Sequence, residues 1–389
     1  MTRRVPLLCA AMTLAFTGAA AAADIEVMTQ NQYLGANLDP IIEAGQSGDL
    51  VALNAAVINA LVTVAGNLPQ QRFEALGALI AKRKPHLVGL QEVFEYSCLG
   101  AGCSDDLVVG AFNDHLGGTV DALDGAYVPV ATIENLNITL PIMTPSGGAW
   151  VTVRDRDVIL ARSDIAAGVT PVTFSCTFPS AVSDGCNFEV VGQVELAGQT
   201  VRVERGYVGV DVTIGGKDYR FVNTHLEVRT PEAGNPLSRI IQSRQADELI
   251  RVAVDTVPDG RELILVGDIN SAPTDEVLQA PVPLPPQWLT PAYMQLTEWA
   301  GLTDTWMLRP GSSTGRGAPL VGFSCCQDED LGNRHSKLEE RIDVIFTSST
   351  PKKVQDARLL GEAVGDKTTP KGSGLWPSDH ASVAARIQY

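Results

Sequence analysis

An unbroken apolar run two-thirds of the way along the chain constrains the fold most. Residues 262–266 read ELILV, which is typical of a strand buried on both faces. Asp268 and Asn270 follow Gly267 and alternate with Ile269, so both polar side chains can point the same way. A carboxylate and an amide at a strand end suit a site that orients water and donates hydrogen bonds to a phosphoryl oxygen. Because these residue types also form turns, the segment alone leaves both interpretations open.

Two other predicted strands also end in polar residues. Residues 221–226 read FVNTHL and place His225 at a strand end, where sites in open sheets are usually built. Residues 87–93 read LVGLQEV and place Glu92 after an apolar strand. Alone, His225 would more often be a structural histidine, and Glu92 could be a solvated surface carboxylate. Glu92 could instead hold a cation, because Mg²⁺ prefers oxygen ligands and often uses only one or two carboxylates.

A third polar group lies near the C-terminus. Asp343 belongs to a segment, RIDVIF, that opens a predicted strand, and Asp379 and His380 directly precede the last strand. A buried aspartate beside a histidine raises the basicity of the imidazole and fixes its tautomer. Asp343 and His380 are therefore a candidate dyad.

Predicted strands alternate with predicted helices along the chain, and Gly215-Gly216 suits a tight hairpin turn. The predicted strands are 25–30, 86–90, 157–161, 207–214, 219–224, 262–266, 342–346 and 382–387, and the predicted helices are 54–64, 70–84 and 237–254. This order indicates an α/β sandwich with mixed sheets. The second helix ends in Lys82-Arg83-Lys84 before Pro85; that basic cluster could bind phosphate, or it could be a helix C-terminus favoured by the dipole.

The N-terminus is typical of a secretory signal peptide. Arg3 and Arg4 precede an apolar stretch, and small residues continue to Ala23, so we expect cleavage near Ala23 and a secreted or periplasmic protein without a stable membrane anchor. Removing residues 1–23 takes away two arginines and no acids, which leaves 27 basic and 45 acidic residues, a net charge of −18. A protein this acidic gains little from non-specific attraction to phosphate backbones, so a general DNA-binding protein is less expected.

Six cysteines remain after the predicted cleavage, and an even number in an exported chain favours disulfides. The spacings suggest Cys98–Cys103 and Cys176–Cys186, whereas the adjacent Cys325 and Cys326 could form a vicinal disulfide or stay reduced. A metal cluster is the competing interpretation, but the pairs lack C-x-x-C spacing and a nearby histidine pair.

These motifs, taken together and in this order, resemble those of the endonuclease/exonuclease/phosphatase superfamily. The matching segments are Asn31 after the first strand, LQEV at Glu92, NTHLE at His225, GDIN at Asp268 to Asn270, RIDVIF at Asp343, and SDH at Asp379-His380. The resemblance covers residues 25–387. It implies a four-layer α/β sandwich, with two mixed β-sheets packed face to face and flanked by helices. It also implies one domain over residues 24–389, with insertions near 96–152 and 272–330.

The resemblance further implies a role for each residue. Glu92 would be the main ligand of a divalent metal, Mg²⁺ with Mn²⁺ or Ca²⁺ as alternatives, helped by Asn31 and Asp379. Asp268 would orient or deprotonate the attacking water. Asn270 and His225 would bind the phosphate, and His380, held by Asp343, would stabilise the transition state or assist proton transfer. These roles describe a metal-dependent phosphoester hydrolase. We expect the protein to be a monomer.

The substrate stays open between a nucleic acid, a phospholipid head group such as that of sphingomyelin, and a small phosphate ester such as an inositol phosphate. A non-catalytic binding module on the same fold and a metal-free extracellular interaction domain are the other classes of protein considered. The segment QYLGANLD after Asn31 offers no second metal ligand that we can assign, and Asp304 in LTDTW fits a family position or a structural role equally well. The GSSTG segment, residues 311–315, formally matches a serine-hydrolase motif, but proline and glycine surround it, so we expect a loop.

Overall fold

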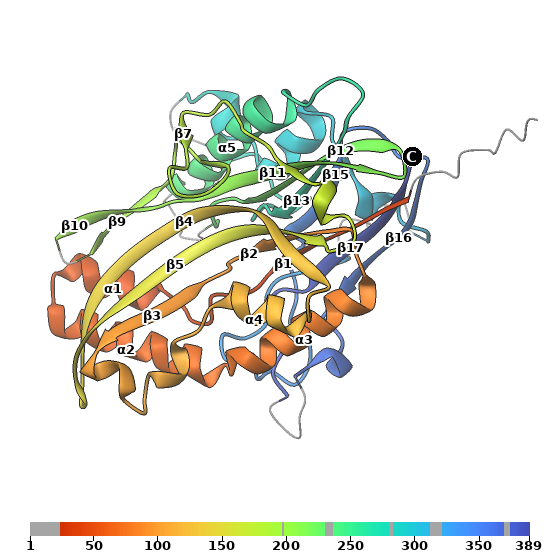
Figure 1. The fold of residues 1–389 in the computed structure, drawn as a ribbon. Helices are drawn as coiled ribbons and strands as arrows, with labels where there is room; N and C mark the ends of the chain where they lie inside the picture. Colours follow the sequence, from red (N-terminus) through yellow and green to blue (C-terminus); the bar gives the residue numbers. More distant parts are fainter. Residues whose placement is uncertain (1–23, 197, 230–235, 280–282, 312–320, 369–373) are drawn as a thin grey trace, which may run out of the picture.

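The computed structural model describes residues 24–389, apart from 197, 230–235, 280–282, 312–320 and 369–373. Two large mixed β-sheets pack face to face, and helices cover the outer face of each (Figure 1). This arrangement confirms the fold class that the sequence predicted. The expected signal peptide, residues 1–23, and most of the GSSTG segment lie outside the described residues.

The first sheet has the strand order β16-β17-β1-β2-β5-β3, and β4 pairs with β5 beside this path. Strands β1 and β2 pair in parallel, and the other neighbours pair antiparallel. The strands are β1 (Asp24–Asn31), β2 (Leu87–Gln91), β3 (Glu95–Gly100), β4 (Tyr127–Thr144), β5 (Gly147–Arg162), β16 (Lys353–Leu360) and β17 (Ser382–Gln388). The helices on its outer side are α1 (Asp39–Ser47), α2 (Leu50–Gly66), α3 (Pro69–Arg83) and α4 (His115–Ala122).

The second sheet has the order β14-β15-β13-β12-β11-β8-β7, with β6 on β11, and β12 and β13 pair in parallel. Its strands are β6 (Thr170–Pro171), β7 (Phe178–Pro179), β8 (Cys186–Asn187), β11 (Gly206–Ile214), β12 (Lys217–His225), β13 (Glu262–Asp268), β14 (Thr303–Asp304) and β15 (Asp343–Thr347). The helical segments packed on it are α5 (Leu237–Leu249), its π-helical continuation η4 (Ile250–Val254), α6 (Ala292–Met294) and η6 (Gln295–Trp299). A separate hairpin joins β9 (Gly192–Leu196) to β10 (Gln199–Val203).

Burial on both faces explains the apolar runs of the central strands. In β13, Ile264 and Val266 pack between the two sheets, while Leu263 and Leu265 pack against the α5 side. All four side chains are fully buried. Side chains alternate along a strand, so a strand covered on both faces must be apolar at every position.

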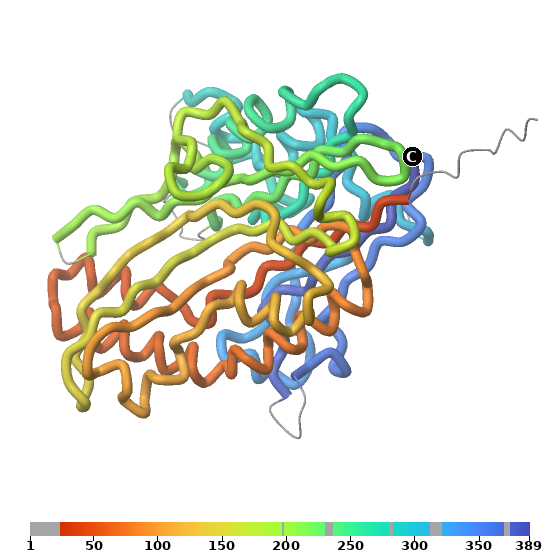
Figure 2. The backbone as a smooth tube through the Cα atoms, in the orientation of Figure 1, coloured from red at the N-terminus to blue at the C-terminus, as the bar shows by residue number. Residues whose placement is uncertain are grey.

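The main difference from the sequence prediction is the long hairpin of β4 and β5, which extends across the first sheet (Figure 2). Residues 96–152, which we predicted as an insertion, contain β4 and the start of β5. Strand β4 was not predicted from the sequence because it contains Pro129 and Pro141, and proline is unfavourable in a central strand. Strand β4 has β5 as its pairing partner, and the register shifts near Pro129 and Glu134. The division into one domain with insertions stays a prediction.

The cysteine pairs agree with the spacing argument. Cys98 is bonded to Cys103, Cys176 to Cys186, and Cys325 to Cys326. Among the described residues, no single helix is long and apolar enough to cross a membrane; α2 and α3 together reach that length and composition, but as a bent pair.

Candidate active site

The pairing register of the second sheet aligns three of the predicted site residues. His225 at the end of β12 lies opposite Asp268 at the end of β13, and Asp268 lies opposite Asp343 at the start of β15. In the first sheet, Asn31 at the end of β1 lies opposite Gln91, the residue before Glu92. The parallel pairs of both sheets therefore end at one edge, as expected for sites at strand carboxyl ends.

The carboxylate of Asp268 is the centre of this cluster. Its Oδ2 atom is 3.1 Å from Asn31 Nδ2, 3.6 Å from His225 Nε2 and 3.8 Å from His380 Nε2. Its Oδ1 atom accepts a hydrogen bond from the backbone N–H of Asn270. Burial and the nearby Asp343 carboxylate raise the pKa of Asp268 to about 7. The group can therefore exchange a proton near neutral pH, which suits a general base.

Asp343 and His380 form the dyad that the sequence predicted. His380 Nδ1 lies 2.8 Å from Asp343 Oδ2, and both side chains are buried. Burial alone would lower the pKa of His380, but the carboxylates of Asp343 and Asp379 outweigh it and raise that pKa well above its usual value. The ring is thus favoured in its cationic form, with Nε2 directed toward Asp268. A cation there can stabilise negative charge that develops on a phosphoryl group.

Asn31 connects the two sheets at this edge. Its Nδ2 atom donates to both Glu92 Oε1 and Asp268 Oδ2, at 3.1 Å each, and its Oδ1 atom accepts from the backbone N–H of Tyr33. Glu92 Oε2 accepts from the backbone N–H of Leu34 at 2.8 Å. Glu92 and Asp379 are half-buried, whereas the other members of the cluster are fully buried, so these two carboxylates form its solvent side.

The charges of the cluster fit a divalent cation. Four carboxylates meet here, from Glu92, Asp268, Asp343 and Asp379. The pKa of Asp379 rises to about 6 because of burial, with a further contribution from Glu92. Ligand atoms of Asp268, Asp343 and His380 lie within 4.8 Å of one another. A bound cation would relieve the mutual repulsion, and oxygen ligands suit Mg²⁺. The family resemblance implied catalytic roles for the residues of this compact group, and the ligand set Asn31, Glu92 and Asp379 stays a prediction.

Two of the site residues have unusual backbone conformations. Glu92 and Asn270 have φ angles of 53° and 49°, in the left-handed region that residues other than glycine rarely adopt. In Asn270 this turn brings the side-chain Nδ2 within 3.2 Å of His225 Nε2 and 3.0 Å of the Leu226 carbonyl oxygen. Residues held in such conformations cost free energy and concentrate at functional sites.

Arg205 is a site residue that our sequence analysis missed. Its Nη1 atom is 3.0 Å from His225 Nδ1, and the side chain is also 3.6 Å from Asp155 Oδ2. Because arginine is always a donor, His225 Nδ1 must accept, which places the ring proton on Nε2, facing Asp268. Burial lowers the pKa of His225 well below its usual value, and the positive charge of Arg205 lowers it further, so this ring is neutral. The predicted hairpin is the signal that could have found this residue. Its register pairs Tyr207 with Thr224, so Arg205, two residues before Tyr207, lies close to His225.

The remaining predicted position, Asp304, has structural partners. Its carboxylate accepts from the Trp306 backbone N–H at 2.9 Å and pairs with the buried Arg341 at 2.6 Å. Among the cysteines, Cys326 is exposed and its Sγ lies 4.0 Å from His380 Nε2, so the vicinal pair borders the site.

Two buried carboxylates behind the site should make stability depend on pH. Asp155 and Asp157 each have a buried oxygen without a hydrogen-bond partner among the described residues. Burial raises the pKa of Asp155 to about 7 and that of Asp157 well above its usual value. Carboxyl groups with raised pKa favour folding while protonated, so this stabilisation is complete below pH ~4 and is lost as the pH rises toward 7 and above.

We therefore expect Asp157→Asn to remove much of this loss. Its free energy of unfolding at pH 8 should exceed that of the wild type by about 1–3 kcal/mol, with a smaller difference at pH 5. Urea unfolding at both pH values measures this, with the exposed Asp106→Asn as the matched control. Equal curves for Asp157→Asn and the wild type at pH 8 would contradict the charge assignment.

A family model and several solved structures resemble this chain. The family model described as the endonuclease/exonuclease/phosphatase family matches residues 58–380. No curated protein sequence matches the chain. Among solved structures, an endonuclease/exonuclease/phosphatase family protein from Bacteroides thetaiotaomicron has a TM-score of 0.50 at 15% identity, covering 95% of this chain and 99% of the other.

Two further solved structures are similar at lower scores. A mannosyl-6-phosphatase from Bacteroides thetaiotaomicron has a TM-score of 0.49 at 16% identity, covering 94% of this chain and 100% of that one. TDP2 from D. rerio, complexed with a single-strand DNA product, has a TM-score of 0.45 at 14% identity, covering 94% and 99%. The family match spans most of the chain: this protein belongs to the endonuclease/exonuclease/phosphatase family and is a phosphoester hydrolase, in a family that typically depends on a divalent metal.

Proposed function

We propose that the chain is a secreted, divalent-metal-dependent phosphodiesterase whose site comprises the eight residues predicted from the sequence. The observation that carries the proposal is the convergence of Asn31, His225 and His380 on Asp268 Oδ2. Residues 237 positions apart in the chain meet in one hydrogen bond, between Asn31 and Asp268. Such an arrangement around one carboxylate suits a reaction in which water must be oriented and deprotonated.

The proposed roles follow from the local chemistry. Asp268, with a pKa near neutrality, orients the attacking water and accepts its proton. Neutral His225 and the amide of Asn270 donate hydrogen bonds to phosphoryl oxygens, while cationic His380 stabilises the charge of the transition state. Asn31, Glu92 and Asp379 would hold the metal, Mg²⁺ in our proposal, which supplies polarisation of the phosphoryl group when bound.

The substrate of this proposal is a phosphodiester, with nucleic acid as the first candidate class. The alternatives are a sphingomyelin-type phospholipid head group and an inositol-phosphate monoester. The acidic net charge of −16 argues mildly against nucleic acid, because attraction of phosphate backbones needs positive charge.

A substrate panel tests the proposal. Metal-stripped protein is incubated with Mg²⁺, Mn²⁺ or no metal and with plasmid DNA, RNA, sphingomyelin, phosphatidylcholine, inositol phosphates and a generic phosphodiester. We expect metal-dependent hydrolysis of at least one diester, and faster turnover of diesters than of the monoester. Preference for the monoester would overturn the diesterase proposal. Absence of metal-dependent turnover on every substrate would overturn the proposal.

A further inference from the structure

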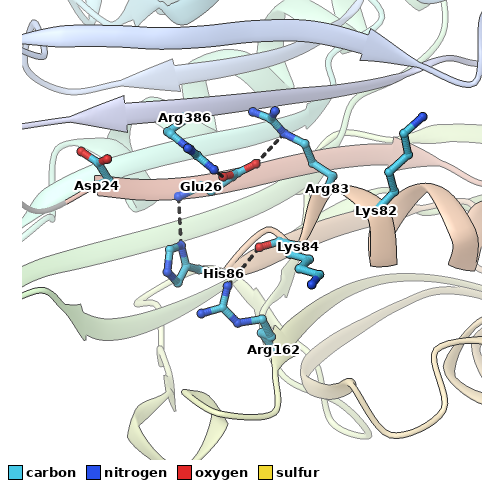
Figure 3. Close-up of a pocket in the computed structure, with 8 residues that line it drawn as sticks. All are labelled: Asp24, Glu26, Lys82, Arg83, Lys84, His86, Arg162 and Arg386. Carbon is cyan, nitrogen blue, oxygen red and sulfur yellow. Dashed lines mark hydrogen bonds and ion pairs between the residues drawn. The ribbon is translucent and has the colours of Figure 1, made fainter.

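A basic hollow lies where β1 begins, at the opposite end of this strand from Asn31 in the catalytic cluster. Figure 3 shows the residues that line it. It has a volume of about 440 Å³. Five cationic side chains, two carboxylates and one histidine line it: Lys82, Arg83, Lys84, Arg162, Arg386, Asp24, Glu26 and His86. The lining carries five positive and two negative charges, but Arg83 also pairs with Asp356 and Arg162 with Asp164, both outside the lining. The lining cations without a carboxylate partner among the described residues are therefore Lys82 and Lys84.

Both carboxylates of the hollow already have partners. Glu26 is buried and accepts hydrogen bonds from Arg386 at 2.8 and 2.6 Å, and it pairs with Arg83. Asp24 accepts from the side-chain amides of Gln355 and Gln388, at 2.8 and 3.1 Å. Glu26 is therefore neutralised by two arginines, whereas Asp24, bonded to neutral amides, keeps its negative charge.

The cations are less completely matched. Lys82 and Lys84 are exposed, and neither ammonium group has an ion-pair or hydrogen-bond partner within the part of the chain that the structure describes. The Arg83 side chain is only 10% exposed, yet its Nη2 atom is buried without a hydrogen-bond partner among the described residues. A buried donor without a partner is costly, and an anion in the hollow would place negative charge beside it.

His86 adds a donor to the same wall. Its Nδ1 atom accepts a hydrogen bond from the backbone N–H of Glu26 at 3.0 Å, which leaves the ring proton of the neutral form on Nε2. Arg162, in turn, is held by a bidentate contact with Asp164, outside the lining, and donates to the Lys84 carbonyl oxygen at 3.0 Å. Hydrogen bonds within the protein therefore fix the positions of His86 and Arg162.

We propose that this hollow binds a small soluble polyanion of the phosphate type. Strand β1 begins in the hollow at Asp24 and ends at Asn31 in the catalytic cluster, so the two sites are separated by roughly 20 Å of strand. Lys82 and Lys84 lie at the C-terminal end of α3, where the helix dipole is negative, so the anion would be held by their ammonium groups and not by the helix end. A compact anion fits better than a polymer or a membrane surface, because the rest of the chain is acidic and would repel an extended array of negative charge.

Calorimetric titration of inorganic pyrophosphate into metal-stripped protein tests this site. Asp268→Asn is titrated in parallel, because the catalytic cluster is the competing location for a phosphate group. The test variant is Lys82→Gln/Lys84→Gln, which keeps the side-chain length and removes two charges. The matched control is Arg202→Gln/Arg251→Gln, which removes two cations that are 39% and 53% exposed and lie outside the lining.

We expect the wild type, Asp268→Asn and the control pair to bind one equivalent with similar Kd. The lysine pair should weaken binding about tenfold or more, because it removes two charge-assisted contacts with the anion. Absence of saturable binding would overturn the proposal. So would binding that is lost in Asp268→Asn and retained in the lysine pair. Co-sedimentation with phosphatidylglycerol vesicles, without binding of soluble pyrophosphate, would also overturn the assignment of a small anion.

Discussion

Asp268→Asn should lower the rate of phosphodiester hydrolysis by about a thousandfold or more, while the folded protein becomes no less stable. The carboxylate is the proposed proton acceptor, and an amide of the same shape cannot fill that role. Asp268 is 1% exposed and its pKa is raised to about 7, so the charged form is unfavourable in the metal-free fold. Replacing it with a neutral amide should raise the free energy of unfolding at pH 8, by about 1–3 kcal/mol.

The measurements are the steady-state rate with saturating Mg²⁺ and urea unfolding without metal. Asp259→Asn is the matched control, since that exposed carboxylate lies just before the same strand and should change neither quantity. Near-normal turnover by Asp268→Asn would remove Asp268 from the reaction. Loss of both turnover and stability would indicate a structural carboxylate instead.

Gly267→Ala should destabilise the fold by at least about 3 kcal/mol. Gly267 precedes Asp268 in β13 and has a φ of 149°. A Cβ atom at this position would meet the backbone carbonyl of Thr224 in the neighbouring strand β12, closer than any real contact. The strand would have to move away from β12, and this would also separate Asp268 from His225, which lies opposite it.

Gly216→Ala separates the two possible causes. Gly216 also has a positive φ, 79°, but a Cβ there would meet nothing within 4 Å, so its cost should be backbone strain alone, about 1 kcal/mol. Both variants are compared by their urea unfolding curves and by their turnover. Equal destabilisation by Gly267→Ala and Gly216→Ala would contradict the role of close strand packing at Gly267.

The central strands and the polar residues at their ends could be predicted from the sequence, because local patterns define both. The run at residues 262–266 is apolar throughout because it packs on both faces. The edge at which Asp268, His225 and Asp343 meet follows from strand direction once the family motifs are recognised. The alignment of these three residues on neighbouring strands, however, depends on the pairing register, which local sequence patterns do not specify.

The parts that could not be predicted depend on long-range contacts. Arg205 is an ordinary arginine in the sequence, and it becomes part of the site only through the pairing of β11 with β12. Strand β4 contains prolines that argue against a strand, and its pairing with β5 overrides that signal. The hollow at Lys82 combines residues from β1, α3, β5 and β17, so its charge balance exists only in the folded chain.

The dependence of phosphodiester hydrolysis on Mg²⁺ tests the central claim most directly. Metal-stripped wild type and Glu92→Gln are assayed across a range of Mg²⁺ concentrations, with Glu74→Gln, an exposed carboxylate of α3, as the control. We predict no turnover without metal, saturable activation of the wild type and the control, and a half-saturating concentration at least about tenfold higher for Glu92→Gln. Turnover that persists in the metal-stripped protein, or an unchanged Mg²⁺ dependence in Glu92→Gln, would contradict a metal-dependent hydrolase with its ion at Glu92.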